Sequence, residues 1–400
     1  MIPVKPILGS RPWAIVLCKF SDQPQEPQPK QFFIDFVTRG NHGINDYFHD
    51  TSYGNMNIDG SQVFGWLDLP YTLAQDKARV GGRYARITAA IEAVKNSIDF
   101  RPFYGICIML NATVDSGGIQ GPALLDLNGT TKRYGLVVLD NLAWGNTWAA
   151  QEMAHGFSLD HSWSADPDTV YGNPFDVMSA FTNNFGFPDQ RFGTDGPGFN
   201  APNLDLMGWL PDSRVFTFQR SVSHHGAGIP YSSTQTVTIS LTALNHPENN
   251  AYLDAKIAAT TLKAGSFVYN IEHRVSDGWD AGLGVNAGIV ITQVRADDNN
   301  YLVAPIFTRN HLDPGERFID TENNITVLFV SKSNNVATVE ITAPVHHVFN
   351  AFAGPAVLDW HIYESIIDTL HAVEKERIHQ VETVFTKFLA AFNENNRTQR

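Results

Sequence analysis

The sequence is poor in cysteine, and this limits what can hold the fold together. Only two of its 400 residues are Cys, Cys18 and Cys107, and each lies in a short apolar run. A framework of several disulfides is therefore excluded. We expect two buried free thiols, with a disulfide between neighbouring strands as the alternative, because a sequence gives no distance between the two sulfurs.

Basic residues are also scarce. The chain has 28 Lys and Arg against 41 Asp and Glu, and its formal net charge is -13 at pH 7. No cluster of Lys and Arg offsets this surplus of negative charge. The sequence therefore predicts no binding to nucleic acid and no attraction to anionic membranes.

Long apolar segments are missing as well. No stretch approaches the roughly 18 apolar residues of a transmembrane helix, and the apolar run at residues 13–17 is too short for a signal peptide. We expect no membrane insertion, and either a cytoplasmic protein or one exported by a non-classical route. The glycosylation pattern leaves export open, since it occurs at Asn111, Asn128, Asn324 and Asn396.

What the chain does contain is typical of a globular protein with more than one domain. Hydrophobic residues make up 43% of it, and 400 residues exceed one typical core. Up to residue 212, buried strands at 13–20, 103–110 and 134–139 alternate with helices. A long helix is expected at 74–94, and a hairpin at 57–69. Residues 1–212 are therefore predicted to form a mixed α/β domain.

The pattern of predicted secondary structure changes after Pro211. Short strands without intervening helices follow, which indicates a β-sandwich at residues 213–345. From residue 358 the apolar residues recur at helical spacing, so 346–400 are predicted to form an amphipathic helical tail. This helix packs on its own protein or, as the alternative, mediates oligomerisation, and the sequence does not decide the oligomeric state. The predicted fold class is α+β.

One segment carries residues with metal-site spacing. Gln151 and His155 stand four positions apart, which brings both side chains to one face of a helix. Glu152 directly follows the first of them, where a carboxylate can take a proton from a metal-activated water. His161 follows six residues after His155, and Met178 lies in the stretch Phe175-Asp-Val-Met-Ser-Ala180.

This order of residues resembles that of metzincin-type zinc peptidases, and among them the gametolysin-like and immune-inhibitor-A-like groups. The resemblance spans roughly residues 12–343. Further stretches that carry it are Phe20-Ser-Asp-Gln23, Asp46-Tyr-Phe48, Thr51-Ser-Tyr-Gly54, Gly65-Trp-Leu67, Asn200-Ala201, Gly208-Trp209, Ile271-Glu-His-Arg274, Gly278-Trp-Asp280 and Leu312-Asp-Pro-Gly315.

The resemblance implies a metzincin-like catalytic domain followed by a β-rich domain. It implies Gln151, His155 and His161 as metal ligands, Glu152 as general base, and Met178 as the floor of the site. The implied ion is Zn²⁺, with another divalent ion such as Cu²⁺ as the alternative. Ca²⁺ has weaker support, from Asp166 and Asp168 in an acidic loop.

Two positions depart from the family pattern. The usual first ligand is His, and here it is Gln151, whose neutral amide oxygen is a weaker zinc donor than imidazole. Some gametolysin-like peptidases also carry Gln at this position. Three residues after the second ligand the family usually has Gly, whereas this chain has Ser158. Either Ser158 adopts a positive φ, or the turn shifts toward Gly156.

Two functions follow from these observations. The first is a metal-dependent endopeptidase that hydrolyses peptide bonds in protein or peptide substrates, with a metal-bound water activated by Glu152. The second is an inactive pseudopeptidase that binds protein or glycan, which the departures at Gln151 and Ser158 favour. Metal content and the nature of residue 151 discriminate between them.

Overall fold

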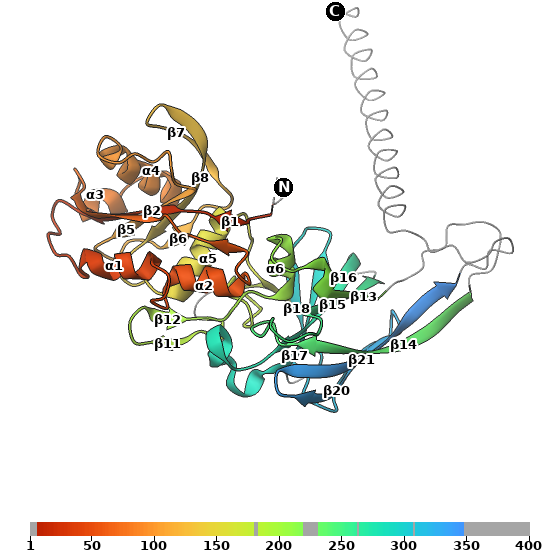
Figure 1. Ribbon diagram of the computed structural model, residues 1–400. Helices are drawn as coiled ribbons and strands as arrows, with labels where there is room; N and C mark the ends of the chain where they lie inside the picture. The colour runs from red at the N-terminus through yellow and green to blue at the C-terminus, as the bar shows by residue number, and fades with distance from the viewer. Residues whose placement is uncertain (1–5, 180–182, 219–230, 262–263, 307–308, 348–400) are drawn as a thin grey trace, which may run out of the picture. The chain divides into compact units, whose positions relative to one another are not determined.

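The computed structural model describes residues 6–179, 183–218, 231–261, 264–306 and 309–347 (Figure 1). These residues belong to one compact unit. Most of the predicted C-terminal tail, residues 348–400, lies outside the described residues. The architecture is mixed α+β, with several sheets and few helices.

The first large sheet carries the candidate site. Its strands run in the order β4-β2-β5-β8-β6, and β7 pairs separately with β8. Strands β4, β2, β5 and β8 are parallel, whereas β6 and β7 run antiparallel to β8. The bounds are β2 Trp13–Lys19, β4 Gln62–Asp68, β5 Gly105–Leu110, β6 Gly117–Gly118, β7 Ala123–Leu127 and β8 Thr130–Leu139.

Strand β2 shows how this sheet divides two cores. Its side chains point alternately to opposite faces, as the period of two in a strand requires. Trp13, Ile15 and Leu17 join one core, with helices α1 (Lys30–Val37), α2 (Ile44–Thr51) and α5 (Asn146–Gly156). Ala14, Val16 and Cys18 join the other core, with helix α4 (Gly82–Val94). Continuous burial on both faces explains the unbroken apolar run in the sequence.

The two cysteines lie in these separate cores, as the prediction of free thiols requires. Cys18 on β2 belongs to the core beside α4, and Cys107 on β5 belongs to the core beside α5. Both are buried free thiols, and burial raises the pKa of Cys18 to about 12. Because the two side chains lie on opposite faces of the sheet, they cannot form a disulfide.

Two local predictions are wrong. The helix expected at 74–94 is divided into α3 (Leu73–Lys77) and α4, because Gly81 and Gly82 both take positive φ, at 100° and 62°. The hairpin expected at 57–69 does not form. Instead β3 (Met56–Asn57) pairs with β1 (Gly9–Ser10), and β4 pairs with β2.

The second half of the molecule contains two further sheets, one of seven strands and one of four. The seven-stranded sheet runs β10-β9-β18-β17-β16-β15-β13, and the four-stranded sheet runs β14-β21-β20-β19. Their buried side chains form one shared hydrophobic core. The bounds are β9 Trp163–Ala165, β10 Asp168–Val170, β13 Val215–Phe218, β14 Tyr231–Thr242, β15 Asp254–Thr261, β16 Gly265–Arg274, β17 Gly288–Arg295, β18 Asn300–Val303, β19 Arg317–Asp320, β20 Ile325–Ser333 and β21 Val336–His347.

The domain boundary after residue 212 stays a prediction. Strands β9 and β10 precede this residue, yet they extend the seven-stranded sheet, because β9 pairs with β18 through Trp163 and Tyr301. The remaining elements are the hairpin β11 (Phe187–Asp189) and β12 (Gly193–Asp195), helix α6 (Ala201–Leu206), and the short 3-10 helices η1 (Asp212–Arg214) and η2 (Gly278–Asn286).

A buried charge network links strand β16 to the segment at the start of helix α6. The Arg274 guanidinium is fully buried and pairs with Glu272 at 3.0 Å and Asp280 at 2.5 Å. Glu272 also accepts a hydrogen bond from the backbone of Ala201, and Asp280 accepts one from that of Gly198. Removing one partner of such a buried pair costs about 3–5 kcal/mol, so this network fixes the two segments against each other.

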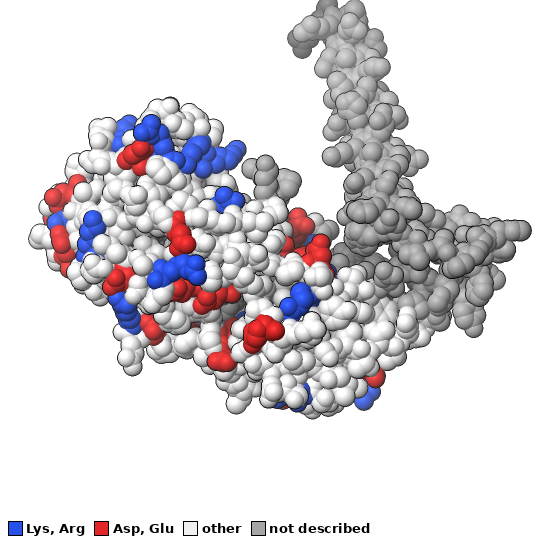
Figure 2. Space-filling model, viewed as in Figure 1, with Lys and Arg blue, Asp and Glu red and all other residues white. Residues whose placement is uncertain are grey.

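The surface fits the sequence composition. On the face shown in Figure 2, Lys and Arg are interspersed with Asp and Glu. None of the described helices combines the length and the apolarity needed to cross a bilayer. The glycosylation pattern at Asn111 coincides with a buried amide that donates to the carbonyls of Gln23 and Gln25. The Asn111 side chain therefore has a structural role.

Candidate metal and catalytic site

Helix α5 positions three of the four predicted site residues. It packs closely on β8, because Gly156 and Gly135 have no side chains to separate them. A Cβ added to Gly156 would lie 3.2 Å from the Cα of Gly135. Gln151, Glu152 and His155 are all buried on this helix, with exposed fractions of 3%, 5% and 5%. They are held in place by the core and not by solvent-exposed contacts.

The turn after α5 returns the chain toward the helix and places His161. The backbone of Ser158 donates to the carbonyl of His155, and that of Leu159 donates to the carbonyl of Ala154. These two bonds form a Schellman motif, in which the residue at the position of Ser158 is usually Gly. Ser158 takes this left-handed conformation with φ 79°. Thus the turn keeps its shape without the Gly, and it does not shift toward Gly156.

All four predicted residues line one cavity of about 360 Å³. The rings of His155 and His161 stand edge to face, with centroids 4.6 Å apart. The other lining residues come from α4, from the segment around β6, from α5 and from the region after β10: Arg83, Ser116, Gly118, Gln120, Trp148 and Tyr171. Trp144 does not line the cavity and packs against Phe33 with ring centroids 5.1 Å apart.

In His155 one ring nitrogen carries the proton and the other has the lone pair. Its Nδ1 lies 2.8 Å from the carbonyl oxygen of Leu159, and because a carbonyl only accepts, Nδ1 carries the proton. Burial lowers the pKa of this imidazole, which keeps it neutral. A neutral ring with Nδ1 protonated has its lone pair on Nε2, which is the form that binds a metal.

His161 has a second contact inside the cavity. Its Nε2 lies 3.1 Å from the hydroxyl of Tyr171, and burial, together with the neighbouring His155, lowers its pKa. Asp160 accepts a hydrogen bond from the backbone of His161 at 2.7 Å. The carboxylate is therefore used within the turn.

Glu152 lies against the edge strand β6. Its Oε2 accepts a hydrogen bond from the backbone N–H of Gly118 at 2.5 Å. Burial raises its pKa, and this bond and the Arg83 charge oppose the rise. A Cβ on Gly118 would lie 2.3 Å from the Glu152 carbonyl oxygen, so only Gly fits here. Such a carboxyl group is suited to exchanging a proton.

Gln151 is the residue whose environment best tests a metal. Its Oε1 is buried and has no hydrogen-bond partner among the described residues. A buried acceptor left unsatisfied costs about 1–3 kcal/mol. An ion held by this oxygen, His155 and His161 would satisfy it, so the donor set fits a divalent metal. It supplies two imidazoles and one amide oxygen.

Met178 lies behind the site. It is fully buried in the core beside α5, and its carbonyl accepts a hydrogen bond from the backbone of Ser162, next to His161. Asp176 in the same turn accepts hydrogen bonds from Ser162 and Asn203. This places the turn where it supports the segment carrying His161.

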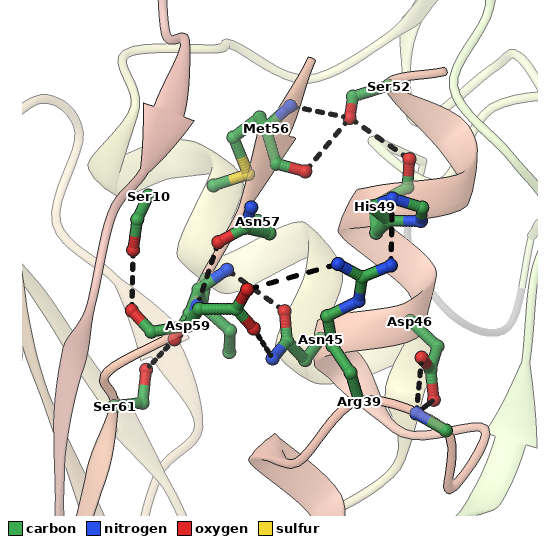
Figure 3. Close-up of polar contacts among 12 residues, drawn as sticks. Ser10, Arg39, Asn45, Asp46, His49, Ser52, Met56, Asn57, Asp59 and Ser61 are labelled. Carbon is green, nitrogen blue, oxygen red and sulfur yellow. Dashed lines mark hydrogen bonds and ion pairs between the residues drawn. The ribbon is translucent and has the colours of Figure 1, made fainter. Parts of the chain in front are cut away.

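Two further residues with side chains able to bind metal lie elsewhere. Asp168, one of the proposed calcium ligands, pairs with Arg295 at 3.1 Å. His49 contacts Arg39 at 2.9 Å in the polar cluster beside α2 and does not line the cavity (Figure 3).

Sequence reasoning missed Arg83 and Tyr171. Arg83 reaches the cavity from α4 and is held by Asp115 at 3.0 Å. Neither residue stands at a recognisable spacing from the helix that carries Glu152. Gly118, which also lines the cavity, belongs to the edge strand β6.

Comparisons with known proteins give limited information. No family model matches the chain, and no curated protein matches it. Two crystal forms of wild-type OgpA from Akkermansia muciniphila are similar in structure. One is 14% identical and covers 75% of this chain and 93% of that one, and the other is 12% identical with 74% and 92%, both with a TM-score of 0.31.

A third similar structure is catalytically inactive OgpA in complex with an O-glycopeptide substrate. It is 10% identical, covers 85% of this chain and 94% of that one, and has a TM-score of 0.29. Likeness at these TM-scores carries no argument about what the chain does.

Proposed function

We propose that the protein is a metal-dependent endopeptidase. The observation that carries this proposal is the meeting of Gln151, Glu152, His155 and His161 in one cavity, with the oxygen of Gln151 buried and unsatisfied. Gln151, His155 and His161 would hold Zn²⁺ or a similar ion. When bound, the ion supplies Lewis acidity that polarises a water molecule and the scissile carbonyl.

Glu152 would serve as the proton carrier. As general base it would take a proton from the attacking water, and it would then pass this proton to the nitrogen of the leaving amine. Its contact with the Gly118 N–H involves only one oxygen, so the other oxygen would be the one that takes the proton. Burial favours the protonated form after the first transfer, because it disfavours the charged carboxylate.

Arg83 and Tyr171 would assist at the carbonyl oxygen. Both line the cavity and both carry donors, so either can stabilise negative charge that develops on that oxygen. The Tyr171 hydroxyl now contacts Nε2 of His161. If His161 binds the ion through this nitrogen, the hydroxyl has to leave it, which makes the donor available to the substrate.

The edge strand β6 offers a way to hold the peptide. It ends the path of the six-stranded sheet, and Gly118 lies at the cavity. An extended peptide commonly binds by adding a strand to a sheet edge. Because the Gly118 N–H is bound to Glu152, such pairing would use the neighbouring backbone groups of this edge and would place a peptide bond next to Glu152.

The test is the substitution Glu152→Gln, assayed on an unfolded protein such as reduced casein with zinc present. The amide keeps the size of the side chain but cannot carry the proton, so cleavage should fall by at least about 100-fold. Glu92→Gln on the exposed face of α4 is the matched control and should cleave like the wild type. Unchanged cleavage by the Glu152 variant would refute the mechanism. A wild type that takes up no zinc and cleaves nothing would favour the pseudopeptidase.

A further inference from the structure

A second cluster of metal-ligand residues lies outside the cavity. Within the part of the chain that the structure describes, it is the only group of three or more His, Cys, Asp or Glu whose ligand atoms lie within 4.8 Å of one another. Its members are His42, Asp189 and Asp195. His42 lies between α1 and α2, Asp189 is the last residue of β11, and Asp195 is the last residue of β12. The fold thus brings together residues about 150 positions apart.

The geometry between His42 and Asp195 points to an ion. Asp195 is only 1% exposed, and its Oδ2 lies 2.9 Å from Nε2 of His42. Even so, this oxygen has no partner with hydrogen-bond geometry among the described residues. Two ligand atoms on one ion, each with a bond of about 2.1 Å, lie about 3 Å apart, with lone pairs directed at the ion and not at each other. A simple ion pair would instead align the oxygen with the N–H.

The loop that carries His42 is held rigidly. The carboxylate of Asp46 accepts hydrogen bonds from three consecutive backbone N–H groups, those of Gly40, Asn41 and His42, at 2.7–3.0 Å. Figure 3 shows Asp46 at the start of α2, turned toward this loop. The His42 ring stacks on Trp279, with centroids 4.3 Å apart and planes inclined by 7°. The imidazole is therefore already oriented before any ligand binds.

The carboxylates are oriented as well. Asp189 accepts hydrogen bonds from the backbone of Arg191 and Phe192 through Oδ1, at 2.8 and 2.5 Å. Asp195 accepts one through Oδ1 from the Asn146 side chain at 2.7 Å. These bonds involve only one oxygen of each group. Partners of this kind, which fix the ligand side chains from behind, are a common property of metal sites.

We propose that His42, Asp189 and Asp195 bind a divalent ion of the zinc class. One imidazole and two carboxylates suit Zn²⁺, Co²⁺ or Ni²⁺, whereas Ca²⁺ and Mg²⁺ prefer oxygen ligands alone. The two carboxylates offset the charge of the ion, and water can complete its coordination. The binding is independent of the proposed peptidase activity.

The position of this cluster indicates a structural role. Asn146 is the first residue of α5, and its side chain donates both to Asp195 and to the carbonyl of His42. Strand β12 packs against the same helix. An ion at the cluster would therefore join the loop before α2, the β11–β12 hairpin and the start of the helix that carries His155.

The test measures bound zinc after equilibrium dialysis of the chelator-treated full-length chain. A His155→Ala background removes the cavity ligand, and this variant should still hold about one zinc per chain. Adding His42→Ala should lower the zinc content to about zero, because one of the three ligands of the cluster is lost. The His42 side chain is 57% exposed, so its removal leaves the core intact.

His246→Ala in the same background is the matched control. Its ring also lies between two carboxylates, but Glu248 and Asp277 contact opposite nitrogens, so the three cannot share one ion. This variant should bind zinc as the background does. A background variant that binds no zinc, or one whose zinc survives His42→Ala, would overturn the proposal. If the wild type and the His155→Ala variant bind equal amounts of zinc, the result would contradict metal binding in the cavity but not metal binding at the cluster.

Fluorescence gives an independent readout. Because the His42 ring stacks on Trp279, Co²⁺ bound at the cluster should quench that tryptophan. The quenching should be seen in the His155→Ala background, and adding Trp279→Phe or His42→Ala should remove it. Quenching that persists in the His42 variant would place the ion elsewhere and refute the assignment.

Discussion

The cavity and the cluster differ in the charge of their ligands. The cavity offers Gln151, His155 and His161, all neutral, whereas the cluster offers two carboxylates with one imidazole. An ion held by neutral ligands keeps its full positive charge and acts strongly on a water or a carbonyl. An ion held by two carboxylates is largely neutralised and is better suited to joining chain segments. The difference teaches that the site with the weaker ligand set is the one suited to chemistry.

The two sites also differ in how the chain builds them. The proposed ligands in the cavity come from one helix and the turn that follows it, within residues 151–161. The cluster draws on three segments that meet only in the folded chain. Zinc affinity at the cluster should therefore depend on the fold as a whole, and affinity at the cavity should depend mainly on α5 and its turn.

The largest effect on this comparison is expected from residue 151. Gln151→His restores an imidazole at the first ligand position and should tighten zinc binding in the cavity by about tenfold or more. Gln151→Leu removes the oxygen and should weaken binding there by a similar factor. Neither change should alter zinc at the cluster. Isothermal titration of variants that also carry His42→Ala isolates the cavity.

Gln120→His is the control for this prediction. It adds an imidazole to the same cavity but away from α5, so it should leave the affinity nearly unchanged. If it tightens binding as much as Gln151→His does, the added ring and not the ligand position would be responsible, and the assignment of Gln151 would be wrong.

A smaller effect concerns the turn that separates the two histidines of the cavity. Ser158 takes φ 79°, which costs a residue with a Cβ roughly 1–2 kcal/mol. Ser158→Gly removes this strain but adds entropy to the unfolded chain, so the net gain in stability should be about 0.5–1 kcal/mol. Urea denaturation of the metal-free protein measures it.

Ser97→Gly serves as the comparison for that measurement. Ser97 is exposed and does not have positive φ. The same chemical change there should give no gain in stability. A Ser158→Gly variant that is no more stable than the wild type would show that the turn is not strained by its side chain.

Much of the first sheet could be predicted from the sequence, because its strands are continuous apolar runs such as residues 13–20. The helix that carries Glu152 also followed from local spacing, whereas the return of His161 was implied by the resemblance to metzincin-type peptidases. The break at Gly81-Gly82 could have been inferred, since two adjacent glycines often end a helix. The apolar periodicity of residues 74–94 predicts one long helix, but the positive φ of these two glycines interrupts it.

What the sequence could not provide is the set of contacts between distant segments. Arg83 reaches the cavity from α4, Gly118 contacts Glu152 from an edge strand, and Asp195 meets His42 across about 150 residues. No periodicity links such positions, because their distances are set by sheet order and by helix packing. For the same reason the polar residues of the cluster looked like ordinary loop residues.

The most direct test of the account is a chelator and reconstitution experiment on the full-length chain. Cleavage of reduced casein should stop once a chelator removes the metal and should return when zinc is restored to the wild type. The His155→Ala variant should stay inactive at every zinc concentration, although its cluster still binds the ion. Proteolysis that survives complete removal of the metal, or that zinc restores equally in the His155 variant, would contradict the claim that this cavity is a metal-dependent active site.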